Sequence, residues 1–216
     1  MNVEFARHQM VYQQVRGWDV GDERVLDVMA AMPREQFVPD AWRSSAFADA
    51  EIPLGHGERM LKPNLEGRLL QSLQLNPTDT VLHIGCGSGY LTACLSQLAG
   101  RVLAVDQHED FIARSRERIS ALAIDDVEFD KMDVAKTLPE QRFDALLVGG
   151  SVATDASPME RLLREGGRMV AVLGAGPAMT ATRVTRTAEE RWQREALFET
   201  WLAPLAGFEP PQEFVF

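Results

Sequence analysis

The stretch VLHIGCGSGY, residues 81–90, decides how this chain folds. It begins inside the apolar run TVLHI (80–84), which predicts a buried strand, and it ends where YLTACLSQLA (90–99) predicts a buried helix. The turn between them consists of small residues: Gly85, Cys86, Gly87, Ser88 and Gly89. Glycine allows a sharp turn from strand to helix and lets backbone N–H groups approach a ligand closely. The stretch therefore predicts a ligand-binding turn.

Strands and helices alternate from this turn onward. The pattern predicts further strands at 101–106, 127–129, 143–150 and 167–174, and helices at 108–122 and 157–165. Residues 179–187 and 195–205 lack an intervening helix and predict an antiparallel pair at one edge. Near-continuous apolar strands that alternate with helices form parallel sheets covered on both faces. The expected fold class is therefore α/β, a doubly wound, mostly parallel, seven-stranded Rossmann-like sheet with antiparallel C-terminal edge strands.

Residues 1–75 form an N-terminal helical extension. Helices are expected at 4–16, 22–32 and 63–75, separated by a proline-rich segment. The remaining residues, 76–216, would hold the cofactor-binding sheet and the C-terminal strands. The chain has 216 residues, 45% of them apolar, and shows neither repeats nor a flexible linker. We therefore expect a single domain over 1–216.

The formal net charge of the chain is −10. Phosphate recognition relies on lysine and arginine, so this charge argues against nucleic acid and acidic membranes as partners. The N-terminus carries no apolar leader and no run reaches membrane-spanning length, which predicts a cytoplasmic protein. The two cysteines and four histidines show no metal-ligand spacing, so no metal site is expected. The sequence leaves the oligomeric state open.

Three classes of ligand are bound by glycine-rich turns of this kind. A phosphate-binding P-loop ends in Gly-Lys followed by Ser or Thr, but here Gly89 precedes Tyr90 and Leu91, so that class is excluded. A dinucleotide-binding turn reads G-x-G-x-x-G, and here the third glycine comes one residue early, which weakens that class. The remaining class is an adenosyl sulfonium cofactor, S-adenosyl-L-methionine.

Two acidic residues after the next two strands support this cofactor. Asp106 ends the second strand, where a carboxylate can accept both ribose hydroxyls; read alone, it would be a helix-capping or first-turn acid. Asp133 lies in the loop after the third strand, beside the adenine in this architecture, where it can accept a hydrogen bond from the exocyclic amine. A solvated loop acid is the alternative reading of Asp133.

Four stretches carry a more specific pattern. They are MVYQQVRGWDVGDERVLDVMAAMPREQFVP (10–39), AFADAEIPLGHGE (46–58), LQLNPTDTVLHIGCGSGYLTACLSQLAGRVLAVD (73–106) and FDALLVGGS (143–151). Together they closely resemble the protein-L-isoaspartate O-methyltransferase family, which belongs to the class I S-adenosylmethionine-dependent methyltransferases. The resemblance implies methylation of abnormal isoaspartyl carboxylates, the step that begins protein repair. The expected cofactor contacts are His83, Gly85, Cys86, Gly87, Ser88, Gly89, Asp106, Gln107, Asp133 and Val134.

His83 departs from the family pattern. The family has an acidic residue two positions before the first loop glycine, where it helps to hold the methionine portion of the cofactor. A neutral histidine can still donate or accept a hydrogen bond there, so we expect weakened or rearranged binding. The alternative is a buried histidine bonded to a neighbouring backbone group.

The loop after PLGHG departs further. The family carries a hydroxyl-rich stretch there, approximately Thr-Ile-Ser-Gln-Pro, whose serine is associated with catalysis and which helps to hold the substrate carboxylate. This chain reads RMLKP, so that Arg59 replaces the threonine and Leu61 replaces the serine. Arg59 and Lys62 can bind a carboxylate in another geometry, or they can be solvated loop charges.

The chemistry of methyl transfer leaves three functions open. An ionised carboxylate needs no general base at neutral pH, so a site without a catalytic His–Asp pair is compatible with methyl transfer. The first function is methylation of a protein or peptide carboxylate, with isoaspartyl activity reduced by the loop changes. The others are methylation of a small-molecule acceptor and non-catalytic cofactor binding, because a fold alone does not establish turnover.

Overall fold

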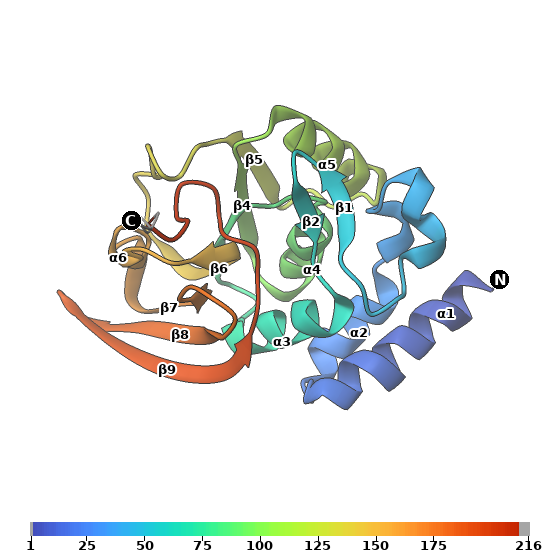
Figure 1. Cartoon of the computed structure of the whole chain (residues 1–216), viewed down its shortest axis with the longest axis horizontal. Coiled ribbons are helices and arrows are strands. Elements are labelled where there is room, and N and C mark those ends of the chain that lie inside the picture. Colours follow the sequence, from blue (N-terminus) through green and yellow to red (C-terminus); the bar gives the residue numbers. More distant parts are fainter. Residues whose placement is uncertain (1, 212–216) are drawn as a thin grey trace, which may run out of the picture.

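The computed structural model describes residues 2–211, and it shows a central seven-stranded sheet with helices packed around it (Figure 1). The strand order is β5-β4-β3-β6-β7-β8-β9. The strands are β3 (Thr80–Ile84), β4 (Arg101–Asp106), β5 (Val127–Lys131), β6 (Phe143–Val152), β7 (Leu163–Leu173), β8 (Met179–Ala188) and β9 (Arg191–Thr200). Strands β3 to β7 pair in parallel, and β8 and β9 add antiparallel to the β7 edge. The predicted fold class is confirmed.

The point where the chain reverses its direction of winding lies between β3 and β6. From β3 the chain adds β4 and β5 on one side, then returns to place β6 on the other side of β3. In open parallel sheets, ligands bind beyond the carboxyl ends of the strands at such a switch point. The turn that follows β3 therefore lies at the favoured binding position.

Both faces of the sheet are buried. Val81 belongs to one hydrophobic cluster and its neighbour Leu82 to another, because successive side chains of a strand point to opposite faces. The first cluster receives side chains from three helices that follow one another along the chain, α3 (Pro63–Leu73), α4 (Tyr90–Leu98) and α5 (Glu109–Ala121). The second is closed by the short α6 (Ser157–Glu160) and by loop residues such as Phe208.

The N-terminal extension is helical as predicted. It comprises α1 (Val3–Gln9), a π-helical continuation (Met10–Val15), a 3-10 turn (Arg16–Trp18), α2 (Glu23–Ala31) and further 3-10 turns at Arg34–Gln36 and Asp40–Ser45. Asn2 and Asp22 cap α1 and α2 by accepting backbone N–H groups of their first turns. Among residues 2–211, no helix has the length and apolarity needed to span a membrane.

Two predicted boundaries are wrong. The helix predicted at 157–165 ends at Glu160, and β7 already begins at Leu163. Gly166 has a positive φ of 79°, which a helix does not accommodate, and a side chain on Gly167 would collide with the carbonyl oxygen of Arg164 at 2.9 Å, so the two glycines interrupt the predicted helix. The last strand, predicted at 195–205, spans 191–200 because a tight turn lets β9 pair with β8 almost from its end.

The sequence patterns also missed a hairpin. Strands β1 (Ile52–Gly55) and β2 (Glu58–Met60) pair antiparallel and lie beside α5 (Figure 1). The tip of the hairpin has positive φ values at Gly55 (112°), His56 (53°) and Gly57 (83°). Two strands this short, one of them containing a proline, produce no alternating hydrophobic pattern that can be recognised in the sequence.

Candidate functional site

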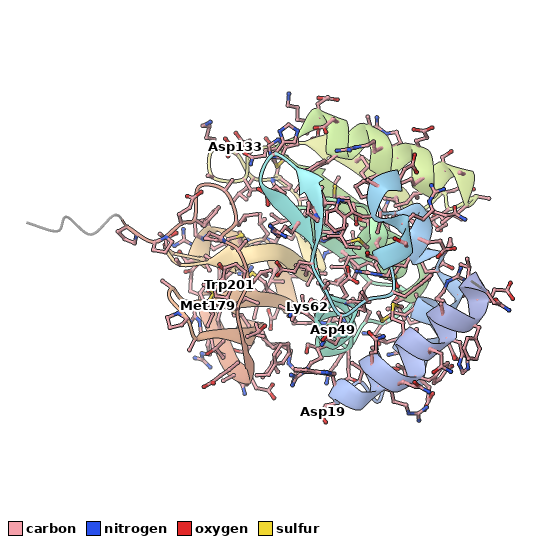
Figure 2. All side chains as sticks on the ribbon, turned by 45° about the vertical axis from the view of Figure 1, so that its right-hand side comes forward. Asp19, Asp49, Lys62, Asp133, Met179 and Trp201 are labelled. Atoms are coloured by element: carbon pink, nitrogen blue, oxygen red, sulfur yellow. The ribbon has the colours of Figure 1, made fainter. Side chains whose placement is uncertain are left out.

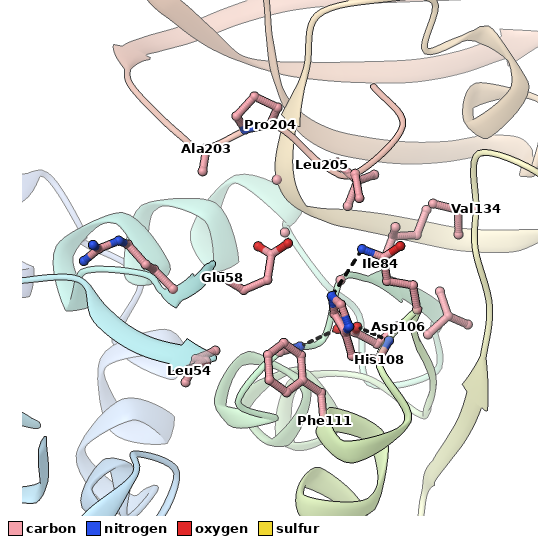
Figure 3. Close-up of a pocket in the computed structure, with 18 of the residues that line it drawn as sticks. Leu54, Glu58, Ile84, Asp106, His108, Phe111, Val134, Ala203, Pro204 and Leu205 are labelled. Carbon is pink, nitrogen blue, oxygen red and sulfur yellow. Dashed lines mark hydrogen bonds between the residues drawn. The ribbon is translucent and has the colours of Figure 1, made fainter. Parts of the chain in front are cut away.

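A cavity of about 780 Å³ opens at the carboxyl ends of β3, β4 and β6. Its walls come from five segments: the β1–β2 hairpin, the glycine turn, the β4–α5 connection, the loop after β5 and the segment 202–206. Figure 3 shows Glu58 and Asp106 pointing into the cavity from one side and Ala203, Pro204 and Leu205 closing it from the other.

The glycine turn presents its backbone to this cavity. Gly85 and Gly87 line it, and both have positive φ values, 75° and 50°, which residues with a side chain rarely adopt. Gly89 does not line the cavity. A side chain on Gly89 would meet Ser115 Oγ at 2.7 Å, so this glycine is needed for the close packing of α4 against α5. The sequence prediction of a cofactor contact thus fits Gly85 and Gly87 better than Gly89.

Asp106 is the best-placed anionic group of the cavity. It is 7% exposed and lines the wall of the cavity. Its Oδ2 accepts the N–H of Gly87 at 2.9 Å, and its Oδ1 accepts the N–H of His108 at 3.0 Å (Figure 3). A carboxylate has about four acceptor positions, so two remain for hydroxyl groups of a ligand. Asp106 therefore orders the turn and keeps acceptor capacity toward the cavity.

Three further predicted cofactor contacts, of which Asp133 was assigned to the adenine, also meet in this cavity. Gln107, Asp133 and Val134 all line it. Asp133 pairs with Lys136 at 2.7 Å, and this hydrogen bond lowers the pKa of the Asp133 carboxyl group below its ordinary value. The carboxylate is therefore ionised and able to accept a further hydrogen bond at neutral pH.

A second, smaller cavity of about 310 Å³, which we call the inner cavity, adjoins the glycine turn and the loop after the hairpin. It shares Gly85 and Gly87 with the larger cavity and adds His83, Cys86 and Ser88, three of the predicted contacts. Burial raises the pKa of the Cys86 thiol, which makes this cysteine unreactive. The two cavities together contain every predicted cofactor contact except Gly89.

His83 is buried and neutral. Burial lowers the pKa of the imidazole to about 3, so the ring carries no charge at neutral pH. Its Nδ1 lies 2.8 Å from the Thr92 hydroxyl, and its Nε2 is buried without a partner among residues 2–211. The partner is thus a side chain and not the neighbouring backbone group considered from the sequence. The unpartnered Nε2 belongs to a wall residue of the inner cavity.

The three residues predicted as site residues in the loop after the hairpin, Arg59, Leu61 and Lys62, do not line the same cavity. Arg59 and the buried Leu61 line both cavities. Lys62 lines neither of them; it belongs to an outer cavity together with Asp49 and Trp201, and Figure 2 shows these three on one side of the molecule. Of the two new cations, only Arg59 can therefore reach a group inside the main cavity.

The loop is held by its backbone. The Arg34 guanidinium is fully buried and donates to the carbonyl oxygen of Leu61 at 2.7 Å and to that of Ala46 at 2.8 Å. It also forms a buried ion pair with Glu66 on α3. None of these contacts involves the Leu61 side chain, which packs separately into the hydrophobic core.

Several wall residues were not predicted as site residues. Glu58 points into the cavity, and burial together with the nearby Asp106 raises the pKa of its carboxyl group. Residues 202–206 arrive from beyond β9 and pair with Ser151. Gly149 and Gly150 at the end of the apolar part of β6 are the sequence signal that another segment packs there. A side chain on Gly150 would collide with the backbone of Leu205 at 2.7 Å.

Comparison with known proteins identifies the family. A sequence profile of the protein-L-isoaspartate(D-aspartate) O-methyltransferase family matches residues 6–209. The chain belongs to this family. A protein-L-isoaspartate O-methyltransferase of Koribacter versatilis is 34% identical over 202 residues, which are 93% of this chain and 90% of that protein. One of Roseiflexus castenholzii is 35% identical over 189 residues, which are 87% and 86% of the two chains.

Solved structures of the family share the fold. A chain assigned as a protein-L-isoaspartate O-methyltransferase of Plasmodium falciparum, crystallised with S-adenosyl-L-homocysteine, superposes with a TM-score of 0.82 at 20% identity. The match covers 93% of this chain and 98% of that one. A second protein-L-isoaspartate O-methyltransferase structure has a TM-score of 0.80, also at 20% identity, and the match covers 94% of this chain and 67% of that one. The fold of this chain is therefore that of these methyltransferase structures.

Proposed function

We propose that this chain uses S-adenosyl-L-methionine to methylate a carboxylate on a protein or peptide, and that ordinary isoaspartyl peptides are poor acceptors. The observation that carries the proposal is one cavity lined by the glycine turn, Asp106 and Arg59. The family membership supports the reaction. The replacement of the loop serine by Leu61 supports the altered acceptor.

The chain's polar groups fit the cofactor. The ribose hydroxyls would be accepted by Asp106, whose remaining acceptor positions face the cavity. Gln107 and Asp133 would hold the adenine end, and the unpartnered Nε2 of His83 lies on the inner side where the amino-acid end would bind. When bound, S-adenosyl-L-methionine supplies an electrophilic methyl group on a sulfonium.

The chain's part in the chemistry is to position the acceptor and exclude water. In-line displacement requires the nucleophile at near-attack distance and in line with the methyl carbon and sulfur. Arg59 would bind an incoming carboxylate by charge, and Leu61 presents an apolar surface where a hydroxyl would have oriented it. An ionised carboxylate needs no proton removed, so no general base is required.

Leu61 also favours a second candidate, a small-molecule acceptor whose apolar part contacts this side chain. Cofactor binding without turnover is the third possibility, and the same assay separates all three. We place the protein in the cytoplasm, because both of its cysteines are unpaired and buried, and we expect no nucleic-acid partner at its net charge of −10.

The test combines binding with transfer. Calorimetry with S-adenosyl-L-methionine and S-adenosyl-L-homocysteine should show binding of both, with NAD as the negative control. Methyl-labelled cofactor is then offered with an isoaspartyl peptide, with aged protein and with a metabolite extract. Label on aged protein with little on the peptide supports the proposal. Efficient labelling of the peptide refutes the altered acceptor, and absence of cofactor binding refutes the proposal as a whole.

A further inference from the structure

Three potential metal ligands meet at the rim of the main cavity. They are His56 at the tip of the β1–β2 hairpin, His108 just before α5, and Asp110 in the first turn of α5. One ligand atom of each lies within 4.8 Å of the others. His56 Nε2 lies 2.9 Å from Asp110 Oδ1, and the two imidazole rings stack with centroids 4.1 Å apart. Residues from distant parts of the sequence thus form one cluster, which sequence spacing could not reveal.

The donor set suits a divalent transition metal. Two imidazole nitrogens and one carboxylate oxygen are ligands typical of zinc, nickel and copper, whereas calcium and magnesium prefer oxygen alone. Zinc bonds of about 2.0–2.2 Å place tetrahedral ligand atoms about 3.3 Å apart. The His56–Asp110 distance is already close to that value, and the His56 side chain is 46% exposed, so its ring is free to turn toward a shared ion.

Neighbouring groups prepare the ligands. The Gln107 amide N–H₂ donates to His108 Nε2 at 3.2 Å, so Nε2 is the unprotonated ring nitrogen, and a metal ion bound there replaces this donor. Arg114 donates to Asp110 Oδ2 at 2.6 Å, which orients the carboxylate with its other oxygen toward His56. Such second contacts commonly orient the residues that ligate metals.

We propose that His56, His108 and Asp110 form a binding site for a divalent transition metal, with water completing the coordination. The site lies at the rim of the proposed methyl-transfer cavity, which His108 also lines, at the junction of two of its walls. The hairpin contributes Leu54, Glu58 and Arg59 to that cavity, and the β4–α5 connection contributes Gln107 and His108. A bound metal therefore ties the hairpin tip to α5 and restrains opening of the cavity.

Zinc calorimetry tests the site directly. The unmodified protein should bind one zinc ion per chain at these three residues. Loss of outer contacts alone costs about 10–100-fold in metal affinity, so loss of a ligand in His56→Ala or Asp110→Asn should weaken binding at least about tenfold. His8→Ala is the matched control, because His8 in α1 is also exposed and its ring lies against Tyr12 of the next helical turn, and the variant should bind zinc as the unmodified protein does.

Two outcomes overturn the site: no zinc binding at submillimolar concentration, or zinc binding that persists unchanged in both ligand variants. Circular dichroism establishes that the variants are folded, which is expected because Asp110 and His56 are exposed. A cobalt spectrum that His8→Ala retains and Asp110→Asn loses provides a second, independent readout.

The effect on the cavity rests on the proposed cofactor and is measured separately. Dissociation of S-adenosyl-L-homocysteine should be several-fold slower with zinc in the unmodified protein and independent of zinc in His56→Ala. If zinc binds and dissociation is unchanged, the site stands and the restraint on opening is wrong. If S-adenosyl-L-homocysteine does not bind at all, the proposed function fails while the zinc titration still decides the metal site.

Discussion

Leu61 is the residue at which acceptor choice can be tested most directly. Its side chain is 6% exposed and lines both cavities, and its carbonyl oxygen is fixed by Arg34 at 2.7 Å. Changing Leu61→Ser therefore puts a hydroxyl where the family has one while the backbone keeps its path. We expect this single change to raise methylation of an isoaspartyl peptide.

Two magnitudes bound the result. One oriented hydrogen-bond donor in a transition-state site is worth about 2.7–4 kcal/mol, or about 10²–10³ in rate. Truncation of a buried leucine costs about 2–5 kcal/mol of stability, and we expect the lower end because this side chain faces a cavity and its removal opens no closed void. The gain in kcat/KM should thus reach about two orders of magnitude, the lower end of this range, in a protein that remains folded.

The assay compares Leu61→Ser with Leu61→Ala, which removes the same apolar surface and adds no hydroxyl. Initial rates with labelled cofactor and an isoaspartyl peptide give kcat/KM, and calorimetry with S-adenosyl-L-homocysteine confirms that the cofactor site is intact. The reasoning is refuted if serine is no better than alanine while cofactor affinity is retained. Adding Arg59→Thr should increase the effect, whereas adding Lys62→Gln should not, because Lys62 lies in the outer cavity.

Three further predictions concern the cofactor cavity and its frame. Asp106→Asn should weaken S-adenosyl-L-homocysteine binding by about 1.5–3 kcal/mol in calorimetry; unchanged affinity would leave Asp106 a purely structural residue. His83→Leu should weaken binding of S-adenosyl-L-homocysteine but not of 5′-methylthioadenosine, which lacks the amino-acid end, and equal losses would contradict this assignment. Arg34→Met should lower the free energy of unfolding in urea by about 3–5 kcal/mol, because Glu66 is left buried without its partner, and a loss below about 1 kcal/mol would contradict that account.

His83 also predicts how stability depends on pH. The folded protein holds its pKa at about 3, below the ordinary 6.5, so the unfolded chain takes up the proton first as the pH falls. Stability from this residue is complete above pH 6.5 and is lost progressively down to pH 3. Urea titrations should show a flatter acid limb in His83→Leu than in the unmodified protein.

The parts of the site that were predictable depend on local chemistry. The glycine turn lies between β3 and α4, and Asp106 lies at the end of the next strand, β4. Their positions relative to one another are therefore fixed by their spacing in the sequence. The hairpin, the segment 202–206 and the contact between His56 and His108 depend on packing between distant segments. The opposite positions of Arg59 and Lys62 depend on a strand ending at Met60, which residue type alone does not indicate.

The buried Arg34 guanidinium has a consequence for how the sequence of this protein can vary in evolution. It holds the loop after the hairpin by the main-chain oxygen of Leu61 and anchors it to α3 through Glu66, and neither contact depends on a side chain of residues 59–62. Substitutions there can alter which molecules are methylated without rebuilding the scaffold. We therefore expect acceptor selectivity to depend mainly on the side chains of this loop. The Arg34–Glu66 pair keeps the loop backbone in place, and the glycine turn and Asp106 keep their positions in the cavity.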